Sequence, residues 1–335
     1  MSLPKLLLYS AGVVFGTIFL LAYFKGGNKP APASEKIALK IPVEIELEVE
    51  APKPAPPPLA AAVKPKIATE APPVSLSEVD RSLPEADRIE ELFKKPSSLK
   101  FIETITYKSR VPWQKGRPAW LSDYASHYET SRHFIARSLN GKPDYFKQDV
   151  AERDKFNVFK KDVKLSFHLV IDTSLCKMWL YALDQTHNER VLLKTYTVSL
   201  GRPDSGKASG LLTPLGRYSL GSRIAIYKPK VMGYYNGKKI EMIRVFGSRW
   251  IPFDKEIAQA TAPAKGFGLH GVPWAEKKGG ELVQDKSSLG KYESDGCIRL
   301  GSEDMEEIFA IVITKPTEIE IVRHFQEASF QPKKS

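Results

Sequence analysis

The chain has 335 residues and a formal net charge of +11, with 42% hydrophobic and 27% charged residues. This composition is ordinary for a globular protein and excludes both a wholly disordered chain and a membrane protein with many spans. The excess of Lys and Arg permits anionic partners, but no segment carries an RRM, KH, zinc-finger or helix-turn-helix signature, so we expect no nucleic-acid partner.

After a short tail at residues 1–5, the first element is an apolar run, LLLYSAGVVFGTIFLLAYF, at residues 6–24. A helix of this length can cross a hydrocarbon core of about 30 Å. The run ends without the small residues of a cleavage site, so we expect an uncleaved transmembrane signal anchor. More lysines follow the run than precede it, which by the positive-inside rule would keep the long part of the chain inside.

Residues 25–84 are rich in proline and contain no aromatic residue. Such a segment cannot bury enough apolar surface to offset its chain entropy, and we expect a disordered stalk with extended polyproline pieces. Between Ile37 and Val49 apolar residues recur at every second position, which is the period of a strand. Two interpretations remain open for this stretch, a solvated spacer and a strand that pairs with the sheet edge of a partner.

The sequence predicts a small α/β module at residues 85–160. A short helix is expected at 84–95, strands at ETITYK and KFNVF, and between them a helical region whose apolar face ends at Asn140-Gly141, a natural helix stop. The order of these pieces resembles a divergent LysM peptidoglycan-binding module, although Gly116-Arg117-Pro118 stands where that family has Gly-Asp. An unrelated small spacer domain is the alternative.

The sequence predicts a mainly β domain at residues 164–325 and a flexible tail at residues 326–335. Short apolar or alternating runs, including EMIRVFG and TEIEIVRHF, are separated by Gly, Pro, Asn and Asp, as in antiparallel sheets. One clear helix interrupts them. We expect Ser302 to cap it and Met305, Ile308, Phe309 and Val312 to line its buried face.

The chemistry of this domain centres on Cys297, one of only two cysteines, in the stretch ESDGCIRL. A free thiol is only a few per cent thiolate at neutral pH, so a catalytic cysteine needs a base. His270, in the Gly-rich stretch GFGLHG, is the candidate. Gly296 allows backbone amides to face an oxyanion, and Arg299 offers a planar fork for a carboxylate.

These residues stand in an ordered set of motifs. The set consists of TPLGRY at 213–218, then His270-Gly271, then Ser288-Leu289-Gly290, then SDGCIRL at 294–300. It resembles the L,D-transpeptidase catalytic domain of the YkuD type. The resemblance runs from about residue 165 to 322, and it implies a mixed β-sandwich.

The resemblance also implies an activity. Cys297 would attack the carbonyl of the third residue of a peptidoglycan stem tetrapeptide and release D-alanine as a thioester forms. His270 would be the base, with the carbonyl of Gly271 orienting its ring, and the amides of Gly296 and Cys297 would hold the oxyanion. An amine of a second stem would then form a 3-3 cross-link. The substrate side would include Arg299, Ser294, Asp295 and Trp274.

Two departures from the family pattern keep alternatives open. Asp295 stands where the family has His, and Cys297 follows His270 by 27 positions, 297 − 270 = 27, a longer gap than in compact members. The carboxylate would raise the thiol pKa unless it pairs with Arg299 or with a substrate ammonium group. The alternatives are an L,D-carboxypeptidase, in which water resolves the thioester, and a non-catalytic wall-binding anchor.

No cofactor is expected, and no metal, because the other histidines lack ligand spacing. The expected partners are stem peptides and, through the apolar run, the cytoplasmic membrane. Peptidoglycan chemistry requires the catalytic domain on the periplasmic or cell-wall side, against the lysine count at the span.

Overall fold

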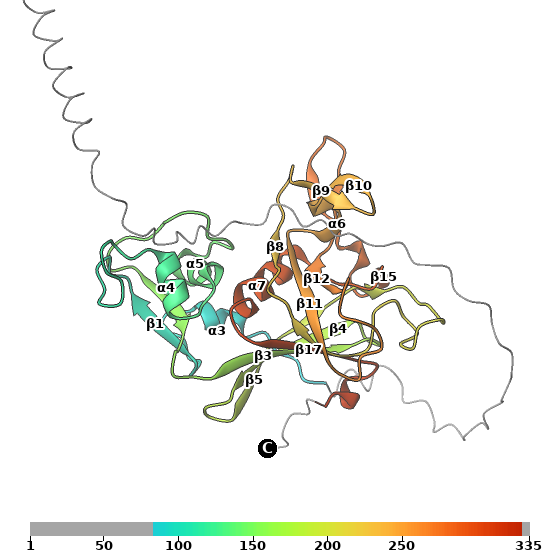
Figure 1. The fold of residues 1–335 in the computed structure, drawn as a ribbon, viewed down its shortest axis with the longest axis horizontal. Coiled ribbons are helices and arrows are strands. Elements are labelled where there is room, and N and C mark those ends of the chain that lie inside the picture. Colours follow the sequence, from blue (N-terminus) through green and yellow to red (C-terminus); the bar gives the residue numbers. More distant parts are fainter. Residues whose placement is uncertain (1–82, 330–335) are drawn as a thin grey trace, which may run out of the picture. The chain divides into compact units, whose positions relative to one another are not determined.

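The computed structural model describes residues 83–329, shown in Figure 1. The expected membrane span, nearly all of the stalk with its alternating stretch, and residues 330–335 lie outside the described residues. Within residues 83–329 no helix is both long and apolar enough to span a bilayer.

The region up to residue 160 has a β-α-α-β order that follows one short helix. Strand β1 pairs antiparallel with β2, and α5 ends at Gly141, whose φ of 75° is left-handed, as the predicted helix stop requires. The elements are α3 (Ile89–Phe93), β1 (Ile102–Thr106), α4 (Leu121–His127), α5 (Arg132–Asn140) and β2 (Lys155–Phe159).

The rest of the described chain is mainly β and is built on a nine-stranded sheet. Its order is β16-β12-β11-β7-β17-β3-β4-β5, with β8 paired to β11. The pairs β12–β16 and β17–β3 are parallel, and the other pairs are antiparallel. The strands are β3 (Leu165–Asp172), β4 (Lys177–Asp184), β5 (Glu189–Thr197), β7 (Gly216–Leu220), β8 (Ala225–Ile226), β11 (Arg249–Ala258), β12 (Gly268–Gly271), β16 (Ile298–Leu300) and β17 (Thr317–Val322).

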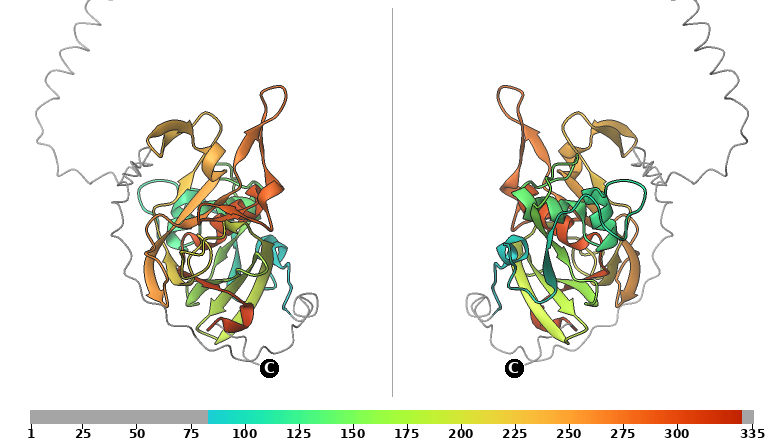
Figure 2. Two further views of the ribbon diagram at one scale, coloured as in Figure 1. Left: turned by 90° about the vertical axis from the view of Figure 1, so that its right-hand side faces the viewer. Right: turned by 90° about the vertical axis from the view of Figure 1, so that its left-hand side faces the viewer.

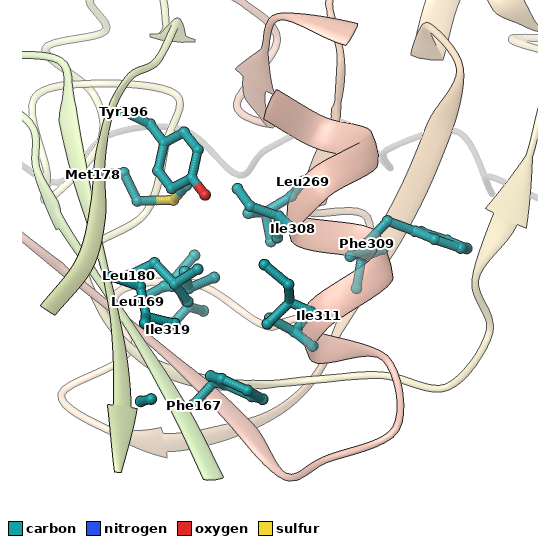
Figure 3. Close-up of a cluster of buried hydrophobic side chains, with 14 of the residues drawn as sticks. Phe167, Leu169, Met178, Leu180, Tyr196, Leu269, Ile308, Phe309, Ile311 and Ile319 are labelled. Atoms are coloured by element: carbon teal, nitrogen blue, oxygen red, sulfur yellow. The ribbon is translucent and has the colours of Figure 1, made fainter. Parts of the chain in front are cut away.

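Helix α7 (Ser302–Val312) connects β16 to β17 and covers one face of this sheet. Because side chains alternate between the faces of a strand, every second residue of β3, β4 and β17 points at the helix. Figure 3 shows the resulting core, whose members are fully or almost fully buried: Phe167, Leu169, Met178, Leu180, Tyr196, Leu269, Ile308, Phe309, Ile311 and Ile319. The face predicted for this helix is confirmed, since Met305, Ile308, Phe309 and Val312 are all buried.

Two sequence predictions about local structure were wrong. The N-cap of α7 is Gly301 rather than Ser302, and no side chain caps the helix. Ser302 begins the helix instead, and its hydroxyl accepts a hydrogen bond from Trp274 Nε1 at 3.2 Å. Most of the run EMIRVFG, expected as a strand, forms the short helix α6 (Ile243–Phe246), which ends at Gly247 with a φ of 60°.

Smaller elements surround the parallel strands β12 and β16. Figure 2 shows the hairpins β9–β10 and β13–β14 projecting from the same end of the described fold. Strand β15 pairs in parallel with β6, which brings the chain before Cys297 against residues 200–201. These elements are β6 (Leu200–Gly201), β9 (Met232–Tyr235), β10 (Lys238–Glu241), β13 (Trp274–Glu276), β14 (Leu282–Gln284), β15 (Tyr292–Ser294) and the 3-10 turns at Lys286–Ser288 and Phe325–Glu327.

One apolar core joins the region before residue 160 to the nine-stranded sheet. Phe159 of β2 lies with its ring centroid 4.7 Å from Phe134 and 5.8 Å from Phe167 of β3. Ile89, Leu92 and other residues of the first region belong to the same buried cluster as α7 and the sheet. The two parts of the described chain therefore share side-chain packing.

Candidate active site

Two adjacent parallel strands bring the predicted catalytic residues together. In the β12–β16 pair, His270 lies opposite Arg299 and Gly271 lies opposite Leu300. Cys297 comes immediately before β16 and two residues before Arg299. Because alternate residues share a face and paired residues point the same way, the side chains of Cys297, Arg299 and His270 occupy one face of this edge of the sheet.

His270 is a buried, neutral imidazole, with 3% of its surface exposed. Its Nδ1 lies 2.7 Å from the carbonyl oxygen of Gly271, the contact expected from the sequence. A carbonyl only accepts, so Nδ1 carries the proton and Nε2 keeps its lone pair. The rings of Phe246 and Trp250 pack on the imidazole at 5.3 and 5.9 Å.

The pKa of His270 is lowered to about 3, first by burial and then by the charge of Arg299, against the opposing effect of the carbonyls of Gly271 and Phe246. A histidine in this environment is uncharged at neutral pH. It can therefore accept a proton at Nε2, provided that the charge it gains is compensated during the reaction.

Cys297 carries a half-buried thiol whose Sγ lies 3.7 Å from the carbonyl oxygen of Gly266. Burial raises its pKa to about 11 and Asp295 adds to the increase, while the backbone amide of Gly268 and the charge of Arg299 lower it. The resting thiol is thus protonated at neutral pH. A nucleophile forms only when a base removes its proton.

The turn before Cys297 is closed by Ser294 and kinked at Gly296. The buried Ser294 hydroxyl donates to the Cys297 carbonyl at 2.6 Å and accepts from the Gly296 amide at 3.1 Å. Gly296 has a φ of 118°, and a Cβ there would lie 2.6 Å from a ring carbon of Phe267, so only glycine fits.

This geometry changes two of the expected roles. Ser294 is completely buried and its hydroxyl is occupied within the turn, so it positions the nucleophile and does not face substrate as expected. The amide of Gly296 is already bonded to Ser294, which leaves the amide of Cys297 as the remaining candidate oxyanion donor of the expected pair.

Thr213 is a residue whose role the sequence did not reveal. It is fully buried, and its Oγ1 accepts from the Gly201 amide at 2.7 Å and donates to the Gly296 carbonyl at 2.9 Å. The segment at 213–218 was recognisable as a family motif, but its contact with the turn at Gly296 spans 83 residues of sequence. No local pattern could have indicated that contact.

The remaining predicted residues lie around this centre. Asp295 is exposed and forms an ion pair with Arg202. The partners expected from the sequence were Arg299 or a substrate ammonium group. Arg299 donates from Nη1 to the Glu293 carbonyl at 3.3 Å. Trp274 is tied to the start of α7 through Ser302.

Among residues 83–329 no three His, Cys, Asp or Glu side chains are grouped so that they could hold a metal ion.

Comparison with protein families gives a match over the same part of the chain. Residues 166–321 match the model of the L,D-transpeptidase catalytic domain, YkuD. The match covers less than half of the chain, and the matched part is called the YkuD domain below. No curated protein matches the chain at the significance required.

One solved structure similar to this chain is that of Bd1075 of Bdellovibrio bacteriovorus. It is 14% identical with a TM-score of 0.32, and the matched region covers 47% of this chain and 48% of the Bd1075 chain. The helical cell shape determining protein Pgp2 of Campylobacter jejuni is 15% identical with a TM-score of 0.32, covering 48% of this chain and 49% of its own. L,D-transpeptidase 1 of Mycobacterium tuberculosis is 16% identical with a TM-score of 0.22, and the matched region covers 50% of this chain and 70% of that protein's chain. The present chain thus spans about half the length of the first two.

Proposed function

We propose that the YkuD domain is a cysteine-dependent peptidoglycan L,D-transpeptidase that acts on stem tetrapeptides. The observation that carries the proposal is the shared face of β12 and β16, on which a buried neutral His270, oriented by the Gly271 carbonyl, accompanies Cys297 and Arg299. A thiol next to a base oriented by a third group is the arrangement that nucleophilic catalysis requires.

The first half-reaction follows from these groups. The proton of Sγ passes to His270 Nε2 as sulfur attacks the carbonyl carbon of the third stem residue. The amide of Cys297 donates to the oxyanion that forms. When the intermediate collapses, the carbon–nitrogen bond breaks, the imidazolium returns the proton to the leaving amine, and D-alanine departs from a thioester on Cys297.

The second half-reaction determines the product. An amine of a second stem attacks the thioester carbonyl while His270 takes its proton. The carbon–sulfur bond then breaks, the proton passes from His270 to the released Cys297 thiolate, and a 3-3 cross-link is formed. If water attacks instead, the product is a tripeptide stem and the enzyme is an L,D-carboxypeptidase. The first half-reaction is the same for both.

The experiment that tests this proposal measures D-alanine released from a tetrapeptide-stem muropeptide by the full chain, with the products separated by mass. We expect release by the native chain and none with Cys297→Ala or His270→Ala, and cross-linked dimer as the main product. Accumulation of tripeptide alone would favour the carboxypeptidase. A chain that binds isolated cell wall but releases no D-alanine would be an anchor, and the proposal would fail.

We further propose that the apolar run at 6–24 anchors the chain in the cytoplasmic membrane with the YkuD domain on the wall side. The support is the length of the run and the extracytoplasmic position of the substrate. Protease added to intact spheroplasts should digest the domain. Protection until the membrane is lysed would contradict this orientation.

A further inference from the structure

The hairpin β9–β10 carries a surface that is both apolar and basic. Val231, Met232 and Tyr234 are 37%, 48% and 59% exposed, and they are three of the six large apolar side chains that lie exposed on residues 83–329. The stretch KPKVMGYYNGKKI at 228–240 also contains four lysines and no acidic residue. All four are exposed: Lys228, Lys230, Lys238 and Lys239. These seven residues are called the hairpin patch.

The two faces of the hairpin have different surroundings. Tyr235 points inward, where its ring lies 5.5 Å from that of Phe246, and Phe246 in turn packs on His270 at 5.3 Å. Because side chains alternate between the faces of a strand, Met232 and Tyr234 point away from this contact. Figure 2 shows the hairpin projecting from the described fold. The hairpin patch therefore faces solvent on an element that packs on the candidate active site.

The basic and apolar surface continues onto the region before residue 160. Phe146 is 59% exposed, and the Nζ of Lys228 lies 3.4 Å from the centroid of its ring. A cation over the face of an aromatic ring is attracted by the ring quadrupole. Two separate parts of the chain thus contribute exposed apolar side chains and positive charge to one surface.

The composition of the hairpin patch matches the interface of an anionic bilayer. At such an interface apolar side chains insert at the boundary of headgroups and acyl chains, tyrosine lies at the level of the headgroups, and lysines attract the negative lipids. A soluble polyanion would meet only the lysines and would leave Val231 and Met232 in water. Apolar side chains gathered on a projecting element indicate a partner that removes them from water.

We propose that the hairpin patch docks the YkuD domain onto a membrane surface that contains anionic phospholipid. The proposed anchor at 6–24 is followed by 58 residues, 83 − 25 = 58, before the described chain begins. A tethered domain meets its own membrane at a high effective concentration, so a weak contact is sufficient. Docking holds the candidate active site close to the bilayer. The inference goes beyond the proposed reaction and does not depend on it.

The test follows a fluorescent dye on the full chain in vesicles of phosphatidylcholine, alone or mixed with an equal amount of phosphatidylglycerol. Cys176→Ser and Cys297→Ser leave Tyr234→Cys as the single cysteine that carries the dye. Lipids with a quencher on the headgroup report contact with the bilayer. We expect strong quenching in the mixed vesicles and little in phosphatidylcholine alone. High salt should reduce the quenching, because it screens the lysines.

Variants of the hairpin patch test which side chains hold the membrane. Lys230→Gln with Lys239→Gln should shift docking roughly 30-fold toward the free state, the combined contribution of two lysines at an anionic surface. The matched control is Lys115→Gln with Lys164→Gln, which removes the same charge from exposed lysines outside the patch and should change the quenching little. Melting temperatures should stay close to that of the native chain, since all four lysines are exposed.

Two further variants test insertion and orientation. Val231→Ser with Met232→Ser should reduce the quenching while the net charge stays the same. A dye on Gln185→Cys, in place of the one at Tyr234, should remain unquenched. Gln185 is exposed in the turn between β4 and β5, and this turn lies at the end of the described fold opposite the hairpin in Figure 1.

Three outcomes would overturn the inference. The dye at Tyr234 stays unquenched in the mixed vesicles, or the dye at Gln185 is quenched to the same extent, or isolated cell wall shields the dye at Tyr234 where lipid does not. The last result would assign the hairpin patch to a wall polymer. Each of them leaves the proposed reaction standing if the native chain releases D-alanine.

Discussion

At the scale of residues, the site holds a protonated thiol and a neutral imidazole in place of a preformed ion pair. The pKa of Cys297 is raised to about 11 and that of His270 is lowered to about 3. At a pH between these two pKa values neither side chain carries a charge in the resting protein. Ionisation of the thiol therefore requires a base that takes its proton.

This state predicts how alkylation of Cys297 depends on pH. Because only the thiolate reacts, the rate with iodoacetamide should rise about tenfold per pH unit from about pH 7 to 9. Intact mass against time gives the rate, and Cys176→Ser removes the other cysteine, which is buried. A rate that levels off below about pH 8 would reveal a preformed thiolate and contradict the raised pKa.

Thr213 provides a second prediction at this scale. Thr213→Val keeps the shape but leaves the Gly201 amide and the Gly296 carbonyl without their partner, so unfolding should become easier by about 1–3 kcal/mol. D-alanine release should fall further than stability does, because the turn that carries Cys297 is no longer held. Thr213→Ser should restore both. A stable Val variant with full activity would show that the hydroxyl does not position Gly296.

The sequence could indicate the central residues but not their supports. Cys297, His270 and Gly271 are indicated as candidates because they stand in short motifs. The motif predicts Ser294 on the substrate side, because a local pattern says nothing about burial. No sequence pattern indicates Arg202, since it meets Asp295 only through the parallel pairing of β6 and β15.

At the scale of elements, β11 connects the candidate active site to the region before residue 160. Arg249, 3% exposed, starts this strand and forms an ion pair with Asp144, while Glu306 of α7 lies 3.9 Å from it. The next residue, Trp250, packs on His270. The position of His270 is thus tied to the buried Arg249 guanidinium, which needs its partner Asp144.

Asp144→Ala should accordingly destabilise the protein by about 3–5 kcal/mol, because it leaves a buried guanidinium without its closest carboxylate. Urea unfolding measures the change. The matched control is Asp149→Ala, in the same loop, which removes a carboxylate paired with the exposed Lys142 and should have no measurable effect. Equal losses in the two variants would contradict the role of burial.

The elements themselves were predictable to different degrees. Strand runs bounded by turn residues, such as TEIEIVRHF, and the apolar face of α7 were strong signals, and both are confirmed. The run EMIRVFG was ambiguous because a short apolar run fits a strand or a helix equally well. Packing of Phe246 against Tyr227, Trp250 and His270 accompanies the helical form.

At the scale of the whole molecule, residues 85–160 contain the order β1-α4-α5-β2, and their resemblance to a LysM module stays a prediction. The family match covers only residues 166–321, so binding of cell wall by residues 85–160 stays a prediction. The sequence could not reveal that Phe134 and Phe159 belong to the core of the YkuD domain, because periodicity shows that a face is apolar but not which surface covers it.

The shared core predicts that the two regions unfold together. A fragment of residues 83–329 should melt in one transition, whereas residues 161–329 alone should be unstable, since Phe167 loses its contact with Phe159 and apolar surface is left open. Calorimetry of both fragments checks this. Two separate transitions in the longer fragment, or a stable shorter one, would show that the regions are independent domains.

The central claim is that Cys297 becomes acylated, and intact mass of the full chain mixed rapidly with a tetrapeptide stem tests it most directly. The account predicts an added mass equal to the stem without its D-alanine, present in the native chain, absent in Cys297→Ala and removed by hydroxylamine. No adduct under conditions in which D-alanine is released, or an adduct that persists in Cys297→Ala, would contradict it.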